Sequence, residues 1–136
     1  MAFINPMKMQ NSMNLPEVSS NLENVRRICL SLPDAVEIVD GHGHITFKIN
    51  GKSFVIIGAR EENSFNLSFK SDRETQELLL QKEHFYKTPY IGRYGWVSIQ
   101  NPKENDWNEL SELIQEAYLR AAPKRLVKKW KDSHPK

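Results

Sequence analysis

The stretch DGHGH holds the residues best suited to binding a metal ion, because Asp40, His42 and His44 are separated by single glycines. Imidazole nitrogens and carboxylate oxygens are common ligands of zinc and other transition metals. Two histidines at this spacing still need a further ligand, and the remaining histidines, His84 and His134, have no comparable neighbours. The glycines are also typical of a plain turn, so we predict a loop without a metal.

No other pattern in the sequence is typical of a catalytic site. A nucleophile elbow, a phosphate-binding loop, a paired-cysteine zinc site and a dinucleotide fingerprint are all missing. The pair Gly92 and Gly95 is too closely spaced for a phosphate loop and opens no helix. The single cysteine, Cys29, lies on the apolar side of a predicted helix and is interpreted as a buried hydrophobic residue. We therefore expect no catalytic residue and no cofactor; a small enzyme with an unrecognised site is the third possibility.

Aromatic and basic residues alternate in the stretch HFYKTPYIGRYGWVSIQ. Aromatic rings can stack on nucleic-acid bases, and basic side chains such as Lys87 and Arg93 can meet phosphates. Tyrosines and phenylalanines in a loop of this kind can equally anchor it to the core. The stretch therefore suggests a nucleic-acid contact and leaves a purely structural role open.

The end of the chain is basic. From position 120 to 136 there are seven lysines and arginines against one acid, whereas the whole chain has a net charge of only +2. Such a segment attracts phosphates or an acidic protein surface, and a solubilising terminus is the alternative.

Length and composition indicate one soluble globular domain. The chain has 136 residues, 39% hydrophobic and 26% charged, and no apolar run approaches the length needed to span a membrane. The N-terminal residues lack a signal-peptide pattern, and a single cysteine agrees with a reducing compartment, so we expect a cytoplasmic location.

The elements that must position these residues follow from hydrophobic periodicity. We predict helices over 21–32, 72–81 and from about 106 to 122, with a further short helix after Pro123. Ser20 with Glu23 and Asp106 with Glu109 have capping-box spacing, and Asp72 is a predicted cap. Strands are predicted over 36–38, 45–49, 53–59, 65–69 and 96–100, with a hairpin at Asn50-Gly51 and a polar turn over 60–63.

The predicted fold is an α+β sandwich with element order α-β-β-β-β-α-β-α. The long N- and C-terminal helices pack on one face of an antiparallel sheet. The expected domain organisation is a flexible N-terminal arm over 1–19, a single domain over 20–122, and a basic tail over 123–136.

The other face of the sheet is expected to be open. If Val97 and Ile99 point to the helices, strand alternation places Trp96 and Ser98 on the open face. By the same rule this face also carries Thr46, Lys48, Asn66, Ser68 and Lys70. An exposed Trp96 would be a binding surface for a planar group, and its removal would cost little stability. The alternative is that a loop or the tail covers it.

Several motifs taken together resemble the MmcQ/YjbR family, whose fold is similar to that of the CyaY (frataxin) proteins. They are CLSLPDAVE, ITFKINGKSFVII, TPYIGRYGWVSI and LIQEAYLRAAPKRL, in this order, within residues 21–129. The resemblance implies the same sandwich and a DNA-binding role. It does not extend to iron delivery, because the first helix carries Glu23 as its one acid against Arg26 and Arg27.

We therefore expect a DNA-binding domain without catalytic activity. The residues expected to meet phosphates are Lys48, Lys70, Lys87, Arg93, Lys124, Arg125, Lys128 and Lys129. Tyr94 and Trp96 are expected to stack on bases. The alternative is a protein-interaction module that docks an acidic protein partner on the open sheet face.

Overall fold

The computed structural model of the 136-residue chain describes residues 16–41, 43–58 and 64–135. Four α-helices are present in these ranges: α2 (Pro16–Leu30), α3 (Arg73–Leu79), α4 (Trp107–Ala121) and α5 (Lys124–Ser133). The strands are β1 (Val36–Val39), β2 (Ile45–Ile49), β3 (Lys52–Gly58), β4 (Asn66–Lys70), β5 (Phe85–Lys87) and β6 (Trp96–Gln100). The predicted N-terminal arm falls outside the described residues over 1–15, and so does the predicted polar turn over 60–63.

The six strands form one antiparallel sheet in the order β1-β2-β3-β4-β6-β5. β2 and β3 are joined by the predicted hairpin, in which Asn50 and Gly51 both have positive φ, at 51° and 79°. A tight two-residue hairpin turn of this type requires positive φ at both of its central residues, which asparagine and glycine tolerate. β3, whose sequence is apolar on both faces, lies inside the sheet between β2 and β4.

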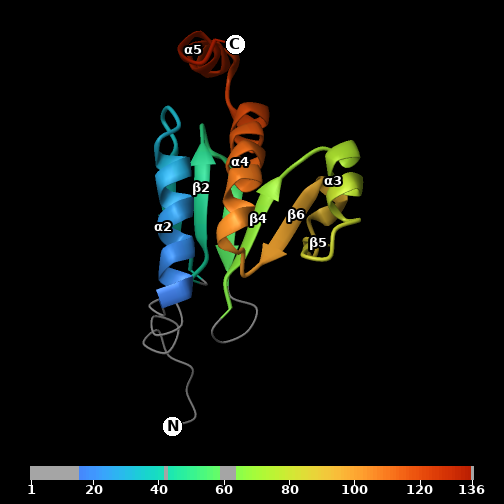
Figure 1. The fold of residues 1–136 in the computed structure, drawn as a ribbon. Helices are drawn as coiled ribbons and strands as arrows, with labels where there is room; N and C mark the ends of the chain where they lie inside the picture. The colour runs from blue at the N-terminus through green and yellow to red at the C-terminus, as the bar shows by residue number, and fades with distance from the viewer. Residues whose placement is uncertain (1–15, 42, 59–63, 136) are drawn as a thin grey trace.

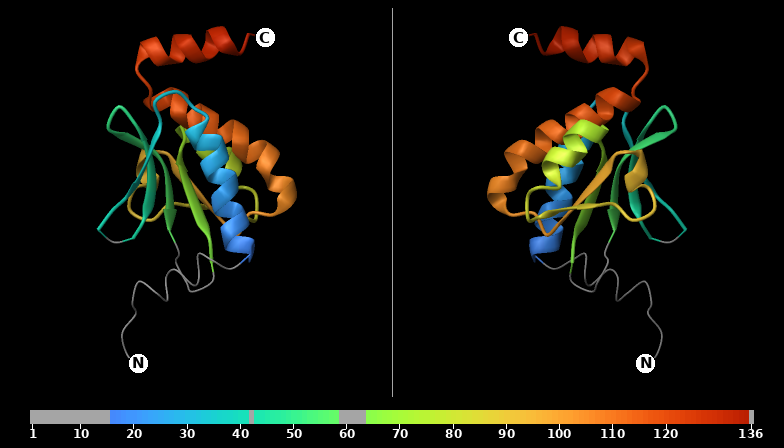
Figure 2. Two further views of the ribbon diagram at one scale, coloured as in Figure 1. Left: turned by 90° about the vertical axis from the view of Figure 1, so that its left-hand side faces the viewer. Right: turned by 90° about the vertical axis from the view of Figure 1, so that its right-hand side faces the viewer.

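Helices α2 and α4 cover one face of this sheet, and no described α-helix lies on the other (Figures 1 and 2). The core between the two layers includes Val25 and Cys29 of α2, and Leu110, Ile114 and Tyr118 of α4. The strands contribute Ile45, Phe47, Val55, Ile57, Leu67, Phe69, Val97 and Ile99. The predicted α+β sandwich is therefore confirmed.

One strand was not predicted. β5 lies in the stretch interpreted as a loop, and it pairs with the outer side of β6 through Phe85, Tyr86 and Lys87. The observed order is thus α-β-β-β-β-α-β-β-α-α. Phe85 belongs to the core and meets Phe69 edge to face, with ring centroids 6.5 Å apart. This short strand fixes the start of the segment that leads to β6.

Two of the three predicted N-terminal caps are not found, because the helices begin at other residues. α2 begins at Pro16, so Ser20 and Glu23 lie inside the helix and do not cap it. Proline is favoured in the first turn, where its missing N–H costs no hydrogen bond. α4 begins at Trp107, and the Asp106 carboxylate accepts from the Lys103 N–H at 2.7 Å, not within a box with Glu109.

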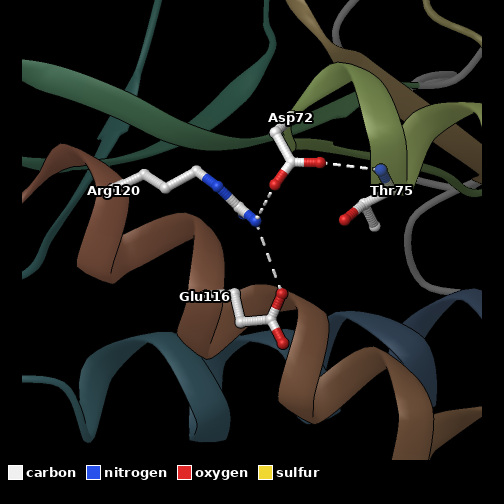
Figure 3. Close-up of polar contacts among 4 residues, drawn as sticks. All are labelled: Asp72, Thr75, Glu116 and Arg120. Carbon is white, nitrogen blue, oxygen red and sulfur yellow. Dashed lines mark hydrogen bonds and ion pairs between the residues drawn. The ribbon is translucent and has the colours of Figure 1, made fainter.

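The third cap is confirmed at α3, where Asp72 accepts from the Thr75 N–H at 2.7 Å. Figure 3 shows that the second oxygen of Asp72 accepts from Arg120 of α4 at 2.9 Å. The hydrogen bond from Thr75, followed by the charge of Arg120, holds the pKa of the Asp72 carboxyl below its usual range. These contacts join α3 to the C-terminal end of α4.

The end of the chain forms a separate helix, as predicted. Pro123 stops α4, and α5 then crosses the end of the domain beyond the C-terminal ends of α2 and α4 (Figures 1 and 2). Leu126 is buried, while Val127 and Trp130 are half-buried. No helix within the described ranges combines the length and the apolar composition that crossing a membrane demands.

Candidate functional site

The open face of the sheet carries a row of side chains that runs across all six strands in register. Its members, in spatial order, are Ile38, Thr46, Ile56, Ser68, Ser98 and Tyr86. Their neighbours along each strand point to the helices, as the predicted alternation requires. The expectation that Thr46, Ser68 and Ser98 face away from the helices is therefore confirmed.

Trp96 projects from the same face, but it is buried, with only 7% of its surface exposed. It lies outside the core cluster formed with the helices, which agrees with its predicted direction. Of the two alternatives that the sequence leaves open, an exposed and a covered Trp96, the structure shows a covered one. Strand alternation predicts which face of the sheet a side chain points to, but not whether another part of the chain lies over that face. Here the segment that follows β5 lies over part of it. In this conformation the indole is not available for stacking on a base.

The segment between β5 and β6 is held by buried hydrogen bonds. The Gln76 amide of α3 donates to the carbonyl of Gly92 at 2.7 Å and to that of Trp96 at 3.0 Å. Gly95 has φ of 94°, and a Cβ there would lie 2.4 Å from the carbonyl oxygen of Ser71. Both glycines therefore serve the turn that delivers β6 to the sheet, and they do not form a phosphate-binding loop.

A pocket of about 390 Å³ lies between the open sheet face and residues 88–91; we call it the open-face pocket. Its floor includes Ile56, Ser68 and Ser98, and its outer wall is formed by Pro89, Tyr90 and Ile91. Its volume is in the range typical of sites for small molecules. The sequence analysis did not predict this pocket, because its walls come from strands that are distant in the sequence.

Hydroxyl groups at the pocket floor bond directly to one another. Ser98 Oγ lies 2.6 Å from Ser68 Oγ and 2.8 Å from Thr88 Oγ1. Nearby, Tyr86 donates its hydroxyl to Asn66 Oδ1 at 2.6 Å. Ser98 is almost fully buried, with 1% of its surface exposed. The floor thus carries a connected network of hydroxyl groups.

Asp40 and His44, singled out in the sequence, lie at the rim of this pocket. The Asp40 carboxylate accepts from the His44 N–H at 2.9 Å and lies 3.2 Å from His44 Nδ1. The imidazole packs over Gly58, where a Cβ would come within 2.9 Å of it. His42 lies outside the described residues. Among the residues that the structure describes, no group of three potential metal ligands occurs.

Three of the predicted binding residues come together beside the start of β6. The Lys70 ammonium donates to the carbonyl oxygen of Tyr94, and the Arg93 guanidinium lies 4.9 Å from the centroid of the Tyr94 ring. Lys48 lies on the open face at the same end of the sheet, whereas Lys87 lies on the edge strand β5 with its stem against Gly92. The predicted binding residues are thus divided among the end of the sheet near the start of β6, the edge strand β5, and α5.

The remaining predicted residues, Lys124, Arg125, Lys128 and Lys129, are all exposed on α5. This helix lies at the end of the domain to which Lys70 also belongs, since Arg120, just before it, bonds to Asp72, just after Lys70. Five basic residues and one acid lie within α5. Lys131, which was not in the predicted set, is exposed there too.

Two further residues that could supply acid, base or nucleophile chemistry, Glu37 and Cys29, lie away from the open-face pocket. The Glu37 carboxylate accepts from Arg26 Nε at 2.9 Å and from its Nη2 at 2.8 Å, which ties β1 to α2. Burial raises the pKa of the Cys29 thiol well above its usual range, so this group stays protonated. Neither residue lines the open-face pocket.

Comparisons with known proteins agree with this architecture. A family model described as YjbR matches residues 30–120, which is more than half of the chain. The crystal structure of Deinococcus radiodurans protein DR2400, with a DUF419 domain, is similar with a TM-score of 0.62 and 23% identity. The match covers 73% of this chain and 76% of that one. A search of curated proteins gave no match. The chain therefore belongs to the YjbR family.

Proposed function

We propose that the chain binds nucleic acid, and DNA in particular, without catalysing a reaction, and that α5 is its main contact surface. The observation that carries the proposal is the division of this helix into two sides. Leu126 and Trp130 pack against the core of the domain, Val127 is half-buried, and the basic residues are exposed. A docked helix with an outward cationic side is suited to contact with phosphates.

The charges on α5 are largely available for such contacts. Within the described part of the chain, Lys124, Lys129 and Lys131 have no acidic side chain at ion-pair distance. Arg125 has only a 3.9 Å contact with Asp34, and Lys128 pairs with Asp132 at 3.0 Å. Exposed pairs of this kind contribute little and are easily exchanged for a phosphate. The helix therefore offers several cations within about two to three turns.

The end of the sheet supplies further positive groups. Lys48, Lys70 and Arg93 lie at the same end of the domain as α5, and Tyr94 is an exposed aromatic ring beside them, 56% exposed. Because Trp96 is buried, we assign any stacking contribution to Tyr94 alone. Contacts of these kinds are independent of base sequence, so we propose weak binding with little sequence preference.

The proposal is tested by fluorescence anisotropy of a labelled DNA duplex across a series of salt concentrations. The triple variant Lys124→Gln, Lys129→Gln, Lys131→Gln removes three exposed charges without disturbing a buried contact. Each phosphate contact contributes about 0.9 to the slope of log K against log salt. The variant should therefore lose about 2.7 of that slope, or roughly 40-fold of the affinity change over a fourfold range of salt.

A matched control removes the same charge elsewhere, by Arg27→Gln, Lys82→Gln and Lys103→Gln. Arg27 lies on α2, Lys82 and Lys103 lie on two loops, and all three side chains are exposed. Equal losses in both triple variants, or no wild-type binding at low salt, would refute the proposal. Pull-down from lysate with and without nuclease separates DNA from the other candidate, an acidic protein partner, because only a nucleic-acid tether is lost on digestion.

A further inference from the structure

The strand β1 forms one edge of the sheet, and half of its backbone groups point away from the sheet. The Asp40 N–H, just after β1, donates to the His44 carbonyl at 3.0 Å, so these two residues form a hydrogen-bonded pair of the antiparallel ladder. Such pairs recur at every second residue, so the backbone groups of Ile38 also point to β2. The N–H and C=O groups of Glu37 and Val39 therefore point outward. Within the described ranges, no strand pairs with this outer side.

Among the described residues, β1 also lacks the features that usually protect an edge strand. Natural sheets protect their edges with lysines, prolines, bulges or covering segments, because an unpaired edge invites another strand. Val36, Ile38 and Val39 are apolar and exposed, by 49%, 41% and 62%. The one charged residue of the strand, Glu37, is turned to α2, where Arg26 donates to it twice. The outer side of β1 is therefore apolar.

The neighbouring side of α2 extends this apolar edge. Arg26 of α2 reaches Glu37, and Leu30 lies one turn further along the same side of the helix, since residues four apart share a face. Leu30 is 49% exposed. The left view of Figure 2 looks at this side of the molecule, with α2 in front and α5 beyond the end of the sheet. The exposed apolar surface thus includes the last turn of α2 together with β1.

The opposite edge of the sheet has a different character. It is formed by β5, which has only three residues, ends with the exposed Lys87, and is followed closely by Pro89. A short strand with a lysine and a nearby proline is protected in the usual way. Of the two edges, β1 is therefore the one suited to pairing with another strand.

We propose that β1 pairs with β1 of a second copy of the chain, antiparallel about a two-fold axis at Ile38. In this register Glu37 of each copy lies opposite Val39 of the other, and their outward N–H and C=O groups form four hydrogen bonds. Ile38 meets Ile38 of the second copy on the open face, where directly opposite Cβ atoms lie about 4.5–5.5 Å apart. The two six-stranded sheets then join into one sheet of twelve strands.

The residues of β1 select this register over its neighbours. Because outward and inward residues alternate, the two-fold axis can lie only at Glu37, Ile38 or Val39 if the outward groups are to meet. An axis at Glu37 would place two carboxylates directly opposite each other, and like charges in that position destabilise a pair. An axis at Val39 would set Glu37 against Gly41, which lies beyond the strand. The axis at Ile38 avoids both and brings apolar side chains together.

The proposed interface is small. A strand of four residues with one turn of a helix buries less than the roughly 1,200 Å² of a standard complex, so we expect a weak dimer with a Kd on the order of 0.1 mM. This inference does not depend on nucleic-acid binding through α5, and each can fail without the other.

The experiment is sedimentation velocity of the full chain, at concentrations from tenfold below to tenfold above this Kd. We expect the weight-average sedimentation coefficient to rise from the value of a monomer toward that of a dimer. Amide hydrogen exchange followed by NMR should slow with concentration at Glu37 and Val39, whose N–H groups become bonded in the dimer. The Ile38 amide, which points to β2 in either state, is the internal reference.

Two variants test the pairing. Ile38→Lys places two like charges opposite each other at the axis and supplies the lysine that natural edges carry. Val39→Pro removes an outward N–H, and with it two of the four hydrogen bonds of the dimer, without removing a bond to β2. Each should weaken dimerisation about tenfold or more. Leu78→Lys, which introduces the same charge at a leucine 60% exposed on α3, is the matched control and should leave the dimer unchanged.

Three results would overturn the proposal. The first is a chain that sediments as a monomer over the whole concentration range. The second is a dimer that persists in both Ile38→Lys and Val39→Pro, since it would use another surface. The third is protection of the Glu37 and Val39 amides that does not change with concentration, because another part of the same chain would then cover the edge. Thermal unfolding of each variant, followed by circular dichroism, confirms that any loss of the dimer occurs in a folded protein.

Discussion

Replacing Trp96 by alanine gives the sharpest test of the open sheet face. Only 7% of the surface of Trp96 is exposed, although the side chain lies on the sheet face that the helices do not cover. A buried tryptophan removes about 150–250 Å² from water. Truncation at Cβ forfeits roughly 150 Å² of this, which at about 25 cal/mol per Å² corresponds to nearly 4 kcal/mol. A compact unfolded state lowers the figure, so we expect a loss of about 3 kcal/mol or more.

The measurement is urea unfolding followed by circular dichroism, because Trp107 and Trp130 would complicate a fluorescence signal. Tyr94→Ala, which truncates an exposed ring in the same segment, should change the free energy of unfolding by less than about 0.5 kcal/mol. A loss below about 1 kcal/mol for Trp96→Ala would show that the indole is solvent-exposed in solution. The burial of Trp96 on this face of the sheet would then be wrong.

Two further predictions concern charged and reactive groups. Asp72→Ala removes the cap of α3 and the contact with Arg120, and should cost about 1 kcal/mol at neutral pH. Because the folded pKa of Asp72 is depressed, its contribution is complete above the unfolded value of about 3.9 and disappears as the pH falls through the folded value. Urea unfolding of wild type and variant should therefore differ at pH 7 and converge in strong acid; a difference that stays constant would contradict this. Burial raises the pKa of the Cys29 thiol, so iodoacetamide should label it only after unfolding. Labelling of the native protein at the rate of an exposed thiol would show that the core opens there.

The two-layer fold could be predicted because its elements have strong and regular patterns. The apolar side of α4, the alternation in β2 and β4, and the Asn50-Gly51 turn each indicate one structure, and the structure contains all of them. β5 could not be predicted in the same way. It has only three residues, and it is a strand because β6 lies beside it, not because of its own sequence.

Local signals also misled where two of them competed. The spacing of Ser20 and Glu23 suits a capping box, but Pro16, a residue favoured in the first turn of a helix, is where α2 begins. A side chain that caps one helix can be an ordinary surface residue within another. The sequence alone does not decide between such alternatives, because packing against the sheet sets the length of the helix.

The candidate site was predicted in part. Strand alternation correctly placed Ser68 and Ser98 on the open face, but it could not show that they touch, since this contact requires β6 to pair with β4 in the observed register. The turn that leads into β6 likewise depends on Gln76, a polar residue whose burial in α3 has no signature in the sequence. Local sequence patterns do not predict tertiary contacts of this kind, because the contacting residues are distant in the sequence.

The position of β6 also has a consequence for the order in which the molecule folds. β1 to β4 pair with their neighbours in the chain, and such local pairing closes quickly. The pairing of β4 with β6 must first close the chain between Lys70 and Trp96, which costs more entropy. The contact between Ser68 and Ser98 spans this late seam. The polar floor of the open-face pocket is therefore completed only when β6 pairs with β4, and it is lost when β6 detaches from the sheet.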